Sequence, residues 1–183
     1  MHDPDISVED YLRVIRYKTA KLFEASARIG AVLAGSDNPL EEACTAYGQA
    51  LGTAFQIVDD LLDYEAPPLR WARTSATTCA SKPTLPLLAA MNRSTPEERE
   101  LIRHAIQNGE VDRLDEIVAI VRRTGALDIT REAARAEAER ARARPALPSS
   151  QFKDALLRLT VLAVDRALSN QTSSRLKSLR GVA

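Results

Sequence analysis

The sequence predicts an all-α protein, and two features of composition and one of pattern support this fold class. Ala, Leu, Arg and Glu, all good helix formers, dominate the 183 residues. Aromatic residues make up only 4% of the chain, and glycine occurs only 7 times. Apolar residues recur at intervals of three and four along most of the sequence, which is the period of an amphipathic helix.

The first predicted helix covers residues 8–33. Ser7 and Asp10 resemble a capping box at its start, and Gly35 ends it. Its apolar series with helical spacing consists of Leu12, Ile15, Thr19, Leu22, Ala25, Ser26, Ile29 and Leu33.

The second predicted helix begins at Pro39, after a Ser-Asp-Asn loop, and runs to about residue 64. Gly48 and Gly52 lie four residues apart in this segment and therefore share one face of the helix. We expect another helix to approach closely on that face.

Residues 65–81 show no periodicity and contain a proline pair, the only Trp and several Thr and Ser, so they are predicted to form an irregular loop. The run Thr95-Pro96-Glu97-Glu98 then supplies an N-cap, a proline at N1 and acidic first-turn residues for a helix. The remaining helices are predicted at about 84–92, 96–107, 112–123, 125–143 and 151–168. Residues 1–168 are expected to form one domain and 169–183 a frayed polar tail.

Composition also excludes several classes of function. The formal net charge is zero, with 25 basic and 25 acidic residues interspersed, so nothing indicates a nucleic-acid partner. The sequence contains no run of about 18 apolar residues, so no transmembrane segment is predicted. The acidic N-terminus does not resemble a signal peptide. Cys44 and Cys79 have neither metal-site spacing nor the density of a disulfide scaffold, which favours a reducing cytoplasm.

The acidic cluster Asp59-Asp60-Leu61-Leu62-Asp63 is the main candidate for chemistry. It lies in the last turns of the second helix, where unpaired carbonyl groups already make the potential negative. Asp59 and Asp63 are one turn apart on the same face, so their carboxylates repel each other. Carboxylates in such a place favour a hard cation, and Mg²⁺ commonly joins one or two carboxylates to substrate phosphate oxygens.

Other polar residues near this cluster leave alternatives open. An Asp-Asp-x-x-Asp run on its own also occurs on solvated helix faces. Gln56 precedes the aspartates by about one turn, and Lys82 supplies a cation after the loop. Lys18 and Thr19 interrupt the apolar series of the first helix, either as a solvent-edge pair or as phosphate contacts.

Three segments together resemble one enzyme family. They are Tyr11-Leu-Arg-Val-Ile-Arg-Tyr-Lys-Thr-Ala-Lys-Leu-Phe-Glu-Ala25, Gly48 through Phe55-Gln-Ile-Val-Asp-Asp-Leu-Leu-Asp-Tyr64, and Lys82-Pro-Thr-Leu-Pro-Leu87. The combination resembles the C-terminal half of the trans-polyprenyl diphosphate synthases, most closely the bacterial octaprenyl type. The resemblance extends from about His2 to Arg166.

The resemblance implies part of an all-α isoprenoid-synthase helical bundle. Members of this family are usually dimers, act in isoprenoid and quinone side-chain biosynthesis, and condense isopentenyl diphosphate with an allylic prenyl diphosphate that ionises with the help of Mg²⁺. By the same resemblance, Asp59, Asp60 and Asp63 are metal-side ligands, some of them through water. Lys18, Thr19 and Lys82 would contact the diphosphate, and Gln56 would lie near the reacting tail.

The sequence departs from the family pattern in two places. The first aspartate-rich motif and the basic residues that hold isopentenyl diphosphate are absent from this chain. Between Tyr64 and Lys82, where the family has a segment like Gly-Lys-Asn-x-Gly-Asp-Asp-Leu, the sequence has nothing similar.

A change of reading frame accounts for the second departure. Back-translation of residues 65–81 with GC-rich codons, read from the third base of the Glu65 codon, gives Gly-Lys-Asn-Val-Gly-Asp-Asp-Leu-Arg-Glu directly before Lys82. We infer two compensating frame changes, near Glu65 and near Ser81, which are either mutations or sequencing errors. Trp71 and Cys79 therefore receive no functional interpretation. Resequencing the gene together with its upstream DNA separates the two explanations.

Three hypotheses for function follow. The first is a prenyltransferase-family polypeptide, a polyprenyl diphosphate synthase by ancestry, whose activity alone is weakened by the missing motif. The second is a non-catalytic partner or degenerate copy that forms a homodimer or pairs with a complementary prenyltransferase chain; it predicts an exposed apolar surface on the first two helices. The third is a generic helical module with a fortuitous acidic cluster. Product chain length cannot be inferred, because the residues that set it in this family lie near the first motif.

Two further features are interpreted as structural. His104 is predicted to lie on the surface of an amphipathic helix, since no cysteine or second histidine is placed to join it. The Arg/Glu-rich stretch 131–144 alternates in sign and is predicted to be a solvated helix face.

Overall fold

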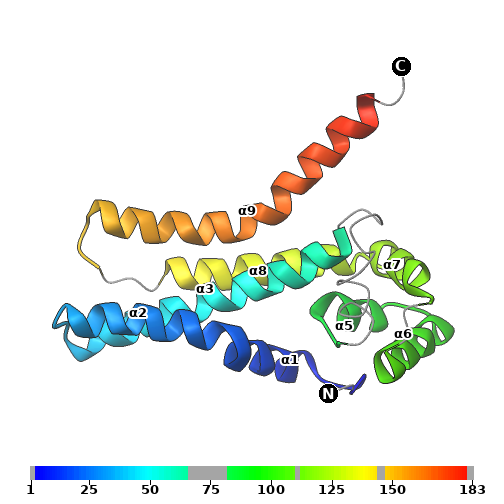
Figure 1. Ribbon diagram of the computed structural model, residues 1–183, viewed down its shortest axis with the longest axis horizontal. Coiled ribbons are helices and arrows are strands. Elements are labelled where there is room, and N and C mark those ends of the chain that lie inside the picture. Colours follow the sequence, from blue (N-terminus) through cyan, green and yellow to red (C-terminus); the bar gives the residue numbers. More distant parts are fainter. Residues whose placement is uncertain (1–2, 66–81, 110–111, 144–146, 181–183) are drawn as a thin grey trace. The chain divides into compact units, whose positions relative to one another are not determined.

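All secondary structure in the described part of the chain is helical (Figure 1), which confirms the predicted fold class. The computed structural model describes residues 3–65, 82–109, 112–143 and 147–180, with side chains only as far as 166. The helices are α1 (Val8–Ile15), a π-helical turn η1 (Arg16–Ala20), α2 (Lys21–Leu33), α3 (Asn38–Glu65), α5 (Leu85–Met91), α6 (Pro96–Asn108), α7 (Leu114–Arg123), α8 (Ala126–Arg142) and α9 (Gln151–Arg180). None of the helices in these ranges has the length and apolar content needed to cross a membrane.

The predicted helix boundaries agree with the structure to within about two residues, except at the end of α9. The prediction that the last helix ends near residue 168 is wrong, because α9 continues to Arg180. The sequence from 168 to 180 is polar but contains neither Gly nor Pro, and Gly181 is the first helix-breaking residue after it. The predicted loop at 65–81 lies outside the described residues from position 66 onwards.

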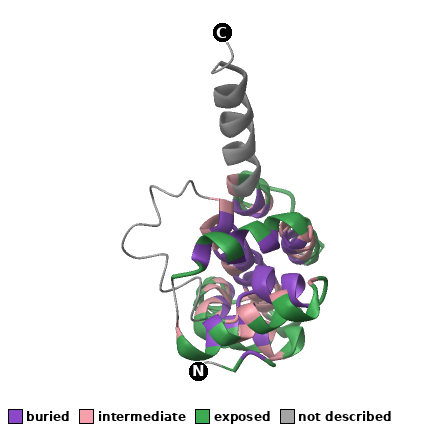
Figure 2. Ribbon diagram, turned by 90° about the vertical axis from the view of Figure 1, so that its right-hand side faces the viewer, coloured by how far each residue is buried: buried purple, intermediate pink, exposed green. Residues whose placement is uncertain are grey.

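The chain forms two compact units, which are described separately. Unit 1 contains residues 1–14 and 59–132, and unit 2 contains residues 15–58 and 133–183. Apart from α5, the helices whose burial is described carry both buried and exposed residues (Figure 2).

Short helix α5 occupies the centre of unit 1. All seven of its residues are buried, which explains why this apolar run shows no amphipathic period. The core around it draws on α3, α6, α7 and the start of α8. Its buried members include Tyr64, Leu87, Ile102, Ile106, Ile117, Ile120 and Val121.

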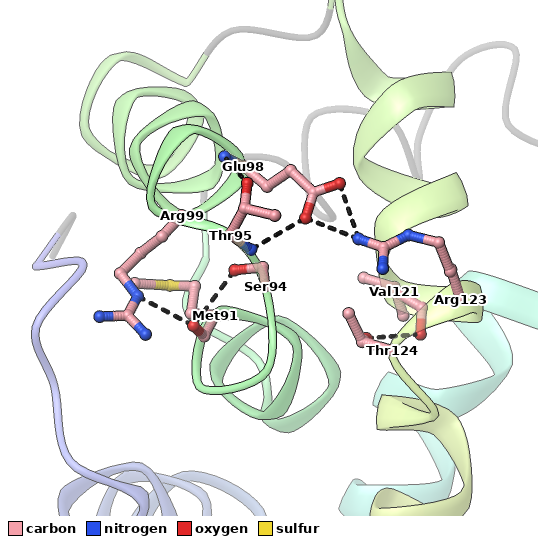
Figure 3. A network of polar contacts seen from close by, with 8 residues as sticks. All are labelled: Met91, Ser94, Thr95, Glu98, Arg99, Val121, Arg123 and Thr124. Atoms are coloured by element: carbon pink, nitrogen blue, oxygen red, sulfur yellow. Dashed lines mark hydrogen bonds and ion pairs between the residues drawn. The ribbon is translucent and has the colours of Figure 1, made fainter.

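A network of caps joins α5, α6 and α7 in unit 1 (Figure 3). Thr95 accepts a hydrogen bond from the Glu98 backbone amide, and the Glu98 side chain accepts one from the Thr95 amide, which confirms the predicted N-cap. The backbone hydrogen bond from Thr95, followed by the nearby Arg123 guanidinium, lowers the pKa of Glu98. Arg123 donates to both Glu98 oxygens, and Arg99 donates to the Met91 carbonyl at 2.9 Å.

The two glycines of α3 lie against the N-terminal helix segment in unit 2, as the sequence predicts. A Cβ atom on Gly48 would come within 2.4 Å of the Phe23 carbonyl oxygen and 2.8 Å of the Glu24 Cα. A Cβ atom on Gly52 would come within 2.7 Å of the Ala20 Cα. Only glycine permits the backbones to approach this closely.

The core of unit 2 forms around this glycine contact. Its buried members are Tyr47, Ala50, Leu51, Ala141 and Ala163, with Phe23, Ala27 and Leu156 packed against them. The Tyr47 hydroxyl donates a hydrogen bond to the Leu156 carbonyl at 2.8 Å and so joins α3 to α9.

The π-turn η1 changes which face of the first helix is buried. Ile15 and Ala20 are buried and five residues apart, whereas a regular helix repeats every three or four. One inserted residue rotates the following segment by about 100°. The apolar series therefore continues on the exposed side of α2, where Leu22, Ile29 and Leu33 are 73%, 57% and 83% exposed.

The charged stretch 131–144 is solvated at most described positions, but the prediction is wrong at two of them. Arg131, in unit 1, is largely buried and forms an ion pair with Glu65. Glu137, in unit 2, is only 8% exposed and accepts hydrogen bonds from Arg16 at 3.1 Å and Arg140 at 2.8 Å. Alternating sign on a helix does not reveal which members meet a partner from another element.

Substitution of the two glycines tests the close approach. We expect Gly48→Ala and Gly52→Ala each to lower the free energy of unfolding by about 1–3 kcal/mol, because the new methyl group meets backbone atoms. Gly30→Ala is the matched control, since a Cβ atom there meets nothing within 4 Å; alanine should stabilise α2 by about 0.5–1 kcal/mol. Urea denaturation followed by circular dichroism measures all three. Equal effects at Gly30 and Gly48 would contradict the packing.

Candidate functional site

The acidic cluster Asp59, Asp60 and Asp63 lies in the last two turns of α3, as the sequence predicts. Asp59 and Asp63 are half-buried and Asp60 is 9% exposed. Neighbouring Leu61 and Tyr64 are fully buried, so core packing in unit 1 fixes this end of the helix. The carboxylates are therefore held where the helix end already carries a negative potential.

Tyr11 of α1 contacts the cluster directly. Its hydroxyl donates a hydrogen bond to Oδ2 of Asp60 at 2.7 Å, and the tyrosine is only 3% exposed. Burial, followed by the charge of Asp60 and this hydrogen bond, raises the pKa of Tyr11 far above its usual value. The phenol therefore remains a proton donor to Asp60 at all physiological pH values.

The pKa of Asp63 reflects both its burial and the neighbouring charges of the cluster. Burial is the largest cause that raises the pKa of Asp63, followed by the charges of Asp60 and Asp59. Lys82, which is exposed, partly offsets these effects, and the resulting pKa is about 6 instead of 3.8. The repulsion that the sequence predicts within the cluster is thus present in the structure.

The donor chemistry of the cluster fits a hard divalent cation. All its side-chain donors are carboxylate oxygens, and burial together with the charges of Asp60 and Asp59 raises the pKa of Asp63. Within the described ranges, no three carboxylate, imidazole or thiol side chains are arranged around one point. In proteins, Mg²⁺ commonly takes one or two carboxylates and completes its coordination with waters and phosphate oxygens.

Three other predicted site residues lie in unit 2. Thr19 and Lys18 are both part of the π-turn η1, and π-turns inside helices are frequent at functional sites. Thr19 donates a hydrogen bond to Oε1 of Gln56 at 2.7 Å, so the structure brings these two predicted residues together. Lys18 is exposed, and Lys82 lies in unit 1 with the aspartates.

An aromatic pair adjoins Gln56. The rings of Phe23 and Phe55 lie 5.4 Å apart, and the Arg166 guanidinium lies 4.1 Å from the centre of the Phe55 ring. Both contacts stabilise the position of Phe55 on α3. They join the residue before Gln56 to α2 and to α9.

Sequence reasoning missed Tyr11 and the π-turn. The available signal for the π-turn is the five-residue step between two apolar positions, Ile15 and Ala20, which breaks the helical period. Tyr11 has no such signal, because nothing in the sequence shows that its hydroxyl meets a residue 49 positions away.

The prediction that His104 lies on the surface of a helix is confirmed. His104 is exposed on α6 and contacts Asn108, one turn further along the helix. Cys44 is not part of a disulfide, and burial raises the pKa of its thiol. Trp71 and Cys79 lie outside the described residues.

Known proteins are similar to most of this chain. The family model described as polyprenyl synthetase matches residues 1–121. Octaprenyl diphosphate synthase of Escherichia coli is 43% identical over 169 residues, which are 91% of this chain and 52% of that protein. All-trans-nonaprenyl-diphosphate synthase (geranyl-diphosphate specific) of Rhodobacter capsulatus is 40% identical over 90% of this chain and 51% of its own length.

Solved structures give the same result for the fold. A polyprenyl synthase from Caulobacter crescentus, complexed with calcium and isoprenyl diphosphate, superposes with a TM-score of 0.82 at 37% identity, over 91% of this chain and 52% of that one. Heptaprenyl diphosphate synthase from Staphylococcus aureus superposes with a TM-score of 0.81 at 26% identity, over the same shares. The chain spans about half the length of the relatives it matches.

The raised pKa of Asp63 predicts a pH-dependent effect of its removal in metal-free buffer. Because folding raises this pKa, ionised Asp63 destabilises the fold; the penalty is absent below the unfolded pKa of about 3.8 and complete above about 6. Allowing for partial solvent exposure, Asp63→Asn should raise the free energy of unfolding by about 1 kcal/mol at pH 8. At pH 5 the gain should be clearly smaller.

Chemical denaturation at the two pH values, with EDTA present, measures this effect. Asp165→Asn, which removes an exposed carboxylate of unit 2, is the matched control and should leave the difference between the two pH values as in the wild type. A gain from Asp63→Asn that is the same at pH 5 and pH 8 would show that the cluster does not raise the proton affinity of Asp63.

Proposed function

The chain belongs to the polyprenyl synthetase family, a trans-prenyltransferase family, and from this premise we propose that it acts on prenyl diphosphates. The proposed reaction joins isopentenyl diphosphate to an allylic prenyl diphosphate, as in the synthesis of isoprenoid and quinone side chains. The observation that carries the proposal is the carboxylate cluster at the end of α3, where Asp63 has its pKa raised to about 6. Such a cluster is suited to hold a diphosphate through a divalent cation.

We propose Mg²⁺ as the cation and Asp59, Asp60 and Asp63 as its protein-side ligands, some through water. When bound, the cation would supply positive charge that offsets the charge on the leaving diphosphate. The calcium in the matched Caulobacter structure supports a divalent cation in this family. Calcium and magnesium are both hard cations with oxygen ligands, so the same donor type serves either.

The other predicted residues receive roles from their chemistry and position. Lys82, whose charge already lowers the pKa of Asp63, is proposed to contact the diphosphate beside the cluster. Lys18 and Thr19 are proposed as diphosphate contacts on the π-turn, and Gln56 as a group near the reacting tail. The hydrogen bond from Thr19 to Gln56 supports the roles proposed for these two residues, because it fixes the orientation of both side chains.

A second candidate function rests on the exposed side of α2. Leu22, Ile29, Val32 and Leu33 are between 53% and 83% exposed on a single helix, as expected if the first helices normally pack against further chain. The relatives are about twice as long as the matched region. We propose that the α2 face binds a polypeptide equivalent to the other half of such a relative, which would complete the domain.

We also propose that the protein is located in the cytoplasm. This proposal rests on the cysteine usage alone.

The metal and diphosphate proposal predicts a binding event that needs no turnover. Geranyl diphosphate with millimolar Mg²⁺ should raise the melting temperature of the chain, and neither component alone should do so to the same extent. Asp59→Ala should abolish the shift. Glu132→Gln, an exposed acid of α8, should retain it. Isothermal calorimetry gives the affinities, and no binding by the wild type at millimolar Mg²⁺ would favour a helical module without this function.

The second candidate predicts a defined complex. Co-expression with the half of the Escherichia coli relative that lies outside the matched region should give a 1:1 complex on size-exclusion chromatography with light scattering. Ile29→Glu combined with Leu33→Glu should weaken it at least tenfold, because both charges fall on the exposed α2 face. Leu159→Glu, at a similarly exposed apolar position of α9, is the control. A chain that stays monomeric and dispersed in the presence of this half would contradict the proposal.

A further inference from the structure

The hydrogen bond between Tyr11 and Asp60 joins two elements of unit 1 that are far apart in sequence. Tyr11 lies on α1 and Asp60 on α3, and both side chains are buried, at 3% and 9% exposure. A buried carboxylate needs hydrogen-bond donors to replace water. The phenol supplies one of them at 2.7 Å, the short distance typical of a donor that meets a charged acceptor.

This bond has a directional consequence for the cluster. Rotation of the Asp60 carboxylate about its Cβ–Cγ bond would break the hydrogen bond between Oδ2 and Tyr11. The tyrosine therefore limits the orientations that the carboxylate can adopt. Asp60 is three residues before Asp63 on the same helix, so their side chains are neighbours on α3, and the charge of Asp60 helps to raise the pKa of Asp63. The Tyr11 hydrogen bond therefore orients one carboxylate of the cluster from outside α3.

We propose that Tyr11 is a positioning residue for the metal-binding cluster and acts through Asp60. This inference rests on the proposed function, since it presumes that the cluster binds a divalent cation. Residues that orient a ligand by hydrogen bonding usually change metal affinity about 10- to 100-fold when removed. A tyrosine that served packing alone would change the melting temperature and leave the affinity for the metal unchanged.

The test measures binding of Mn²⁺ alone to the full chain, by electron paramagnetic resonance of the unbound ion and by calorimetry. Tyr11→Phe should weaken Mn²⁺ binding about tenfold. Tyr47→Phe is the matched control, because it removes a hydroxyl from another buried tyrosine, one that donates to the Leu156 carbonyl in unit 2. The control should bind Mn²⁺ as the wild type does, even if its melting temperature falls.

A double-mutant cycle separates action through Asp60 from a general effect. In an Asp60→Asn background, Tyr11→Phe should cause less than a twofold further change in Mn²⁺ affinity. If Tyr11→Phe lacks wild-type circular dichroism, 3-fluorotyrosine in place of Tyr11 keeps the bond but alters the strength of the donor, and it should change the affinity measurably. Wild-type Mn²⁺ affinity in the folded Tyr11 variant overturns the positioning role. Absence of Mn²⁺ binding by the wild-type chain overturns the proposed metal site itself.

Discussion

The concentration of carboxylates at the end of a packed helix is the constraint on which the site depends. The α3 terminus already has a negative potential, and burial removes water that would otherwise stabilise three adjacent charges. Two identified interactions partly compensate these charges. Tyr11 donates a hydrogen bond to Asp60, and the charge of Lys82 offsets part of the rise in the pKa of Asp63. Neither removes the strain, because the pKa of Asp63 remains at about 6. The core around Tyr64 must therefore hold the helix end in place against repulsion, and that is why the cluster is suited to a cation.

The π-turn and the glycine pair together organise the corresponding part of unit 2. The inserted residue rotates α2, so that Phe23 and Ala20 meet the glycine face of α3. The same turn presents Thr19 to Gln56. One irregularity therefore accompanies both the close backbone contact at the glycines and a polar pair, and it leaves Leu22, Ile29 and Leu33 exposed to solvent.

Sequence reasoning recovered what depends on local chemistry. The Thr95 cap, the start of α3, the close approach at Gly48 and the position of the aspartates all follow from residue type and spacing, and the structure shows each. Residue type and spacing do not reveal which particular distant residues contact each other. The Arg131 to Glu65 ion pair and the Tyr11 to Asp60 bond depend on which faces of two helices meet, and the end of α9 depends on a polar segment that remains helical because nothing breaks it.

The identified contacts of the candidate residues bear on what this chain can do. Tyr11, Lys82 and the three aspartates all belong to unit 1, and Thr19 and Gln56 both belong to unit 2, so each set interacts within its own unit. The proposed cation ligands therefore all lie in unit 1. Turnover requires more than cation binding, because the developing charge on a leaving diphosphate must be stabilised by groups oriented around it in a site without water. The proposed cation binding can therefore be tested apart from turnover, and the exposed α2 face is the surface on which we propose that a second polypeptide binds.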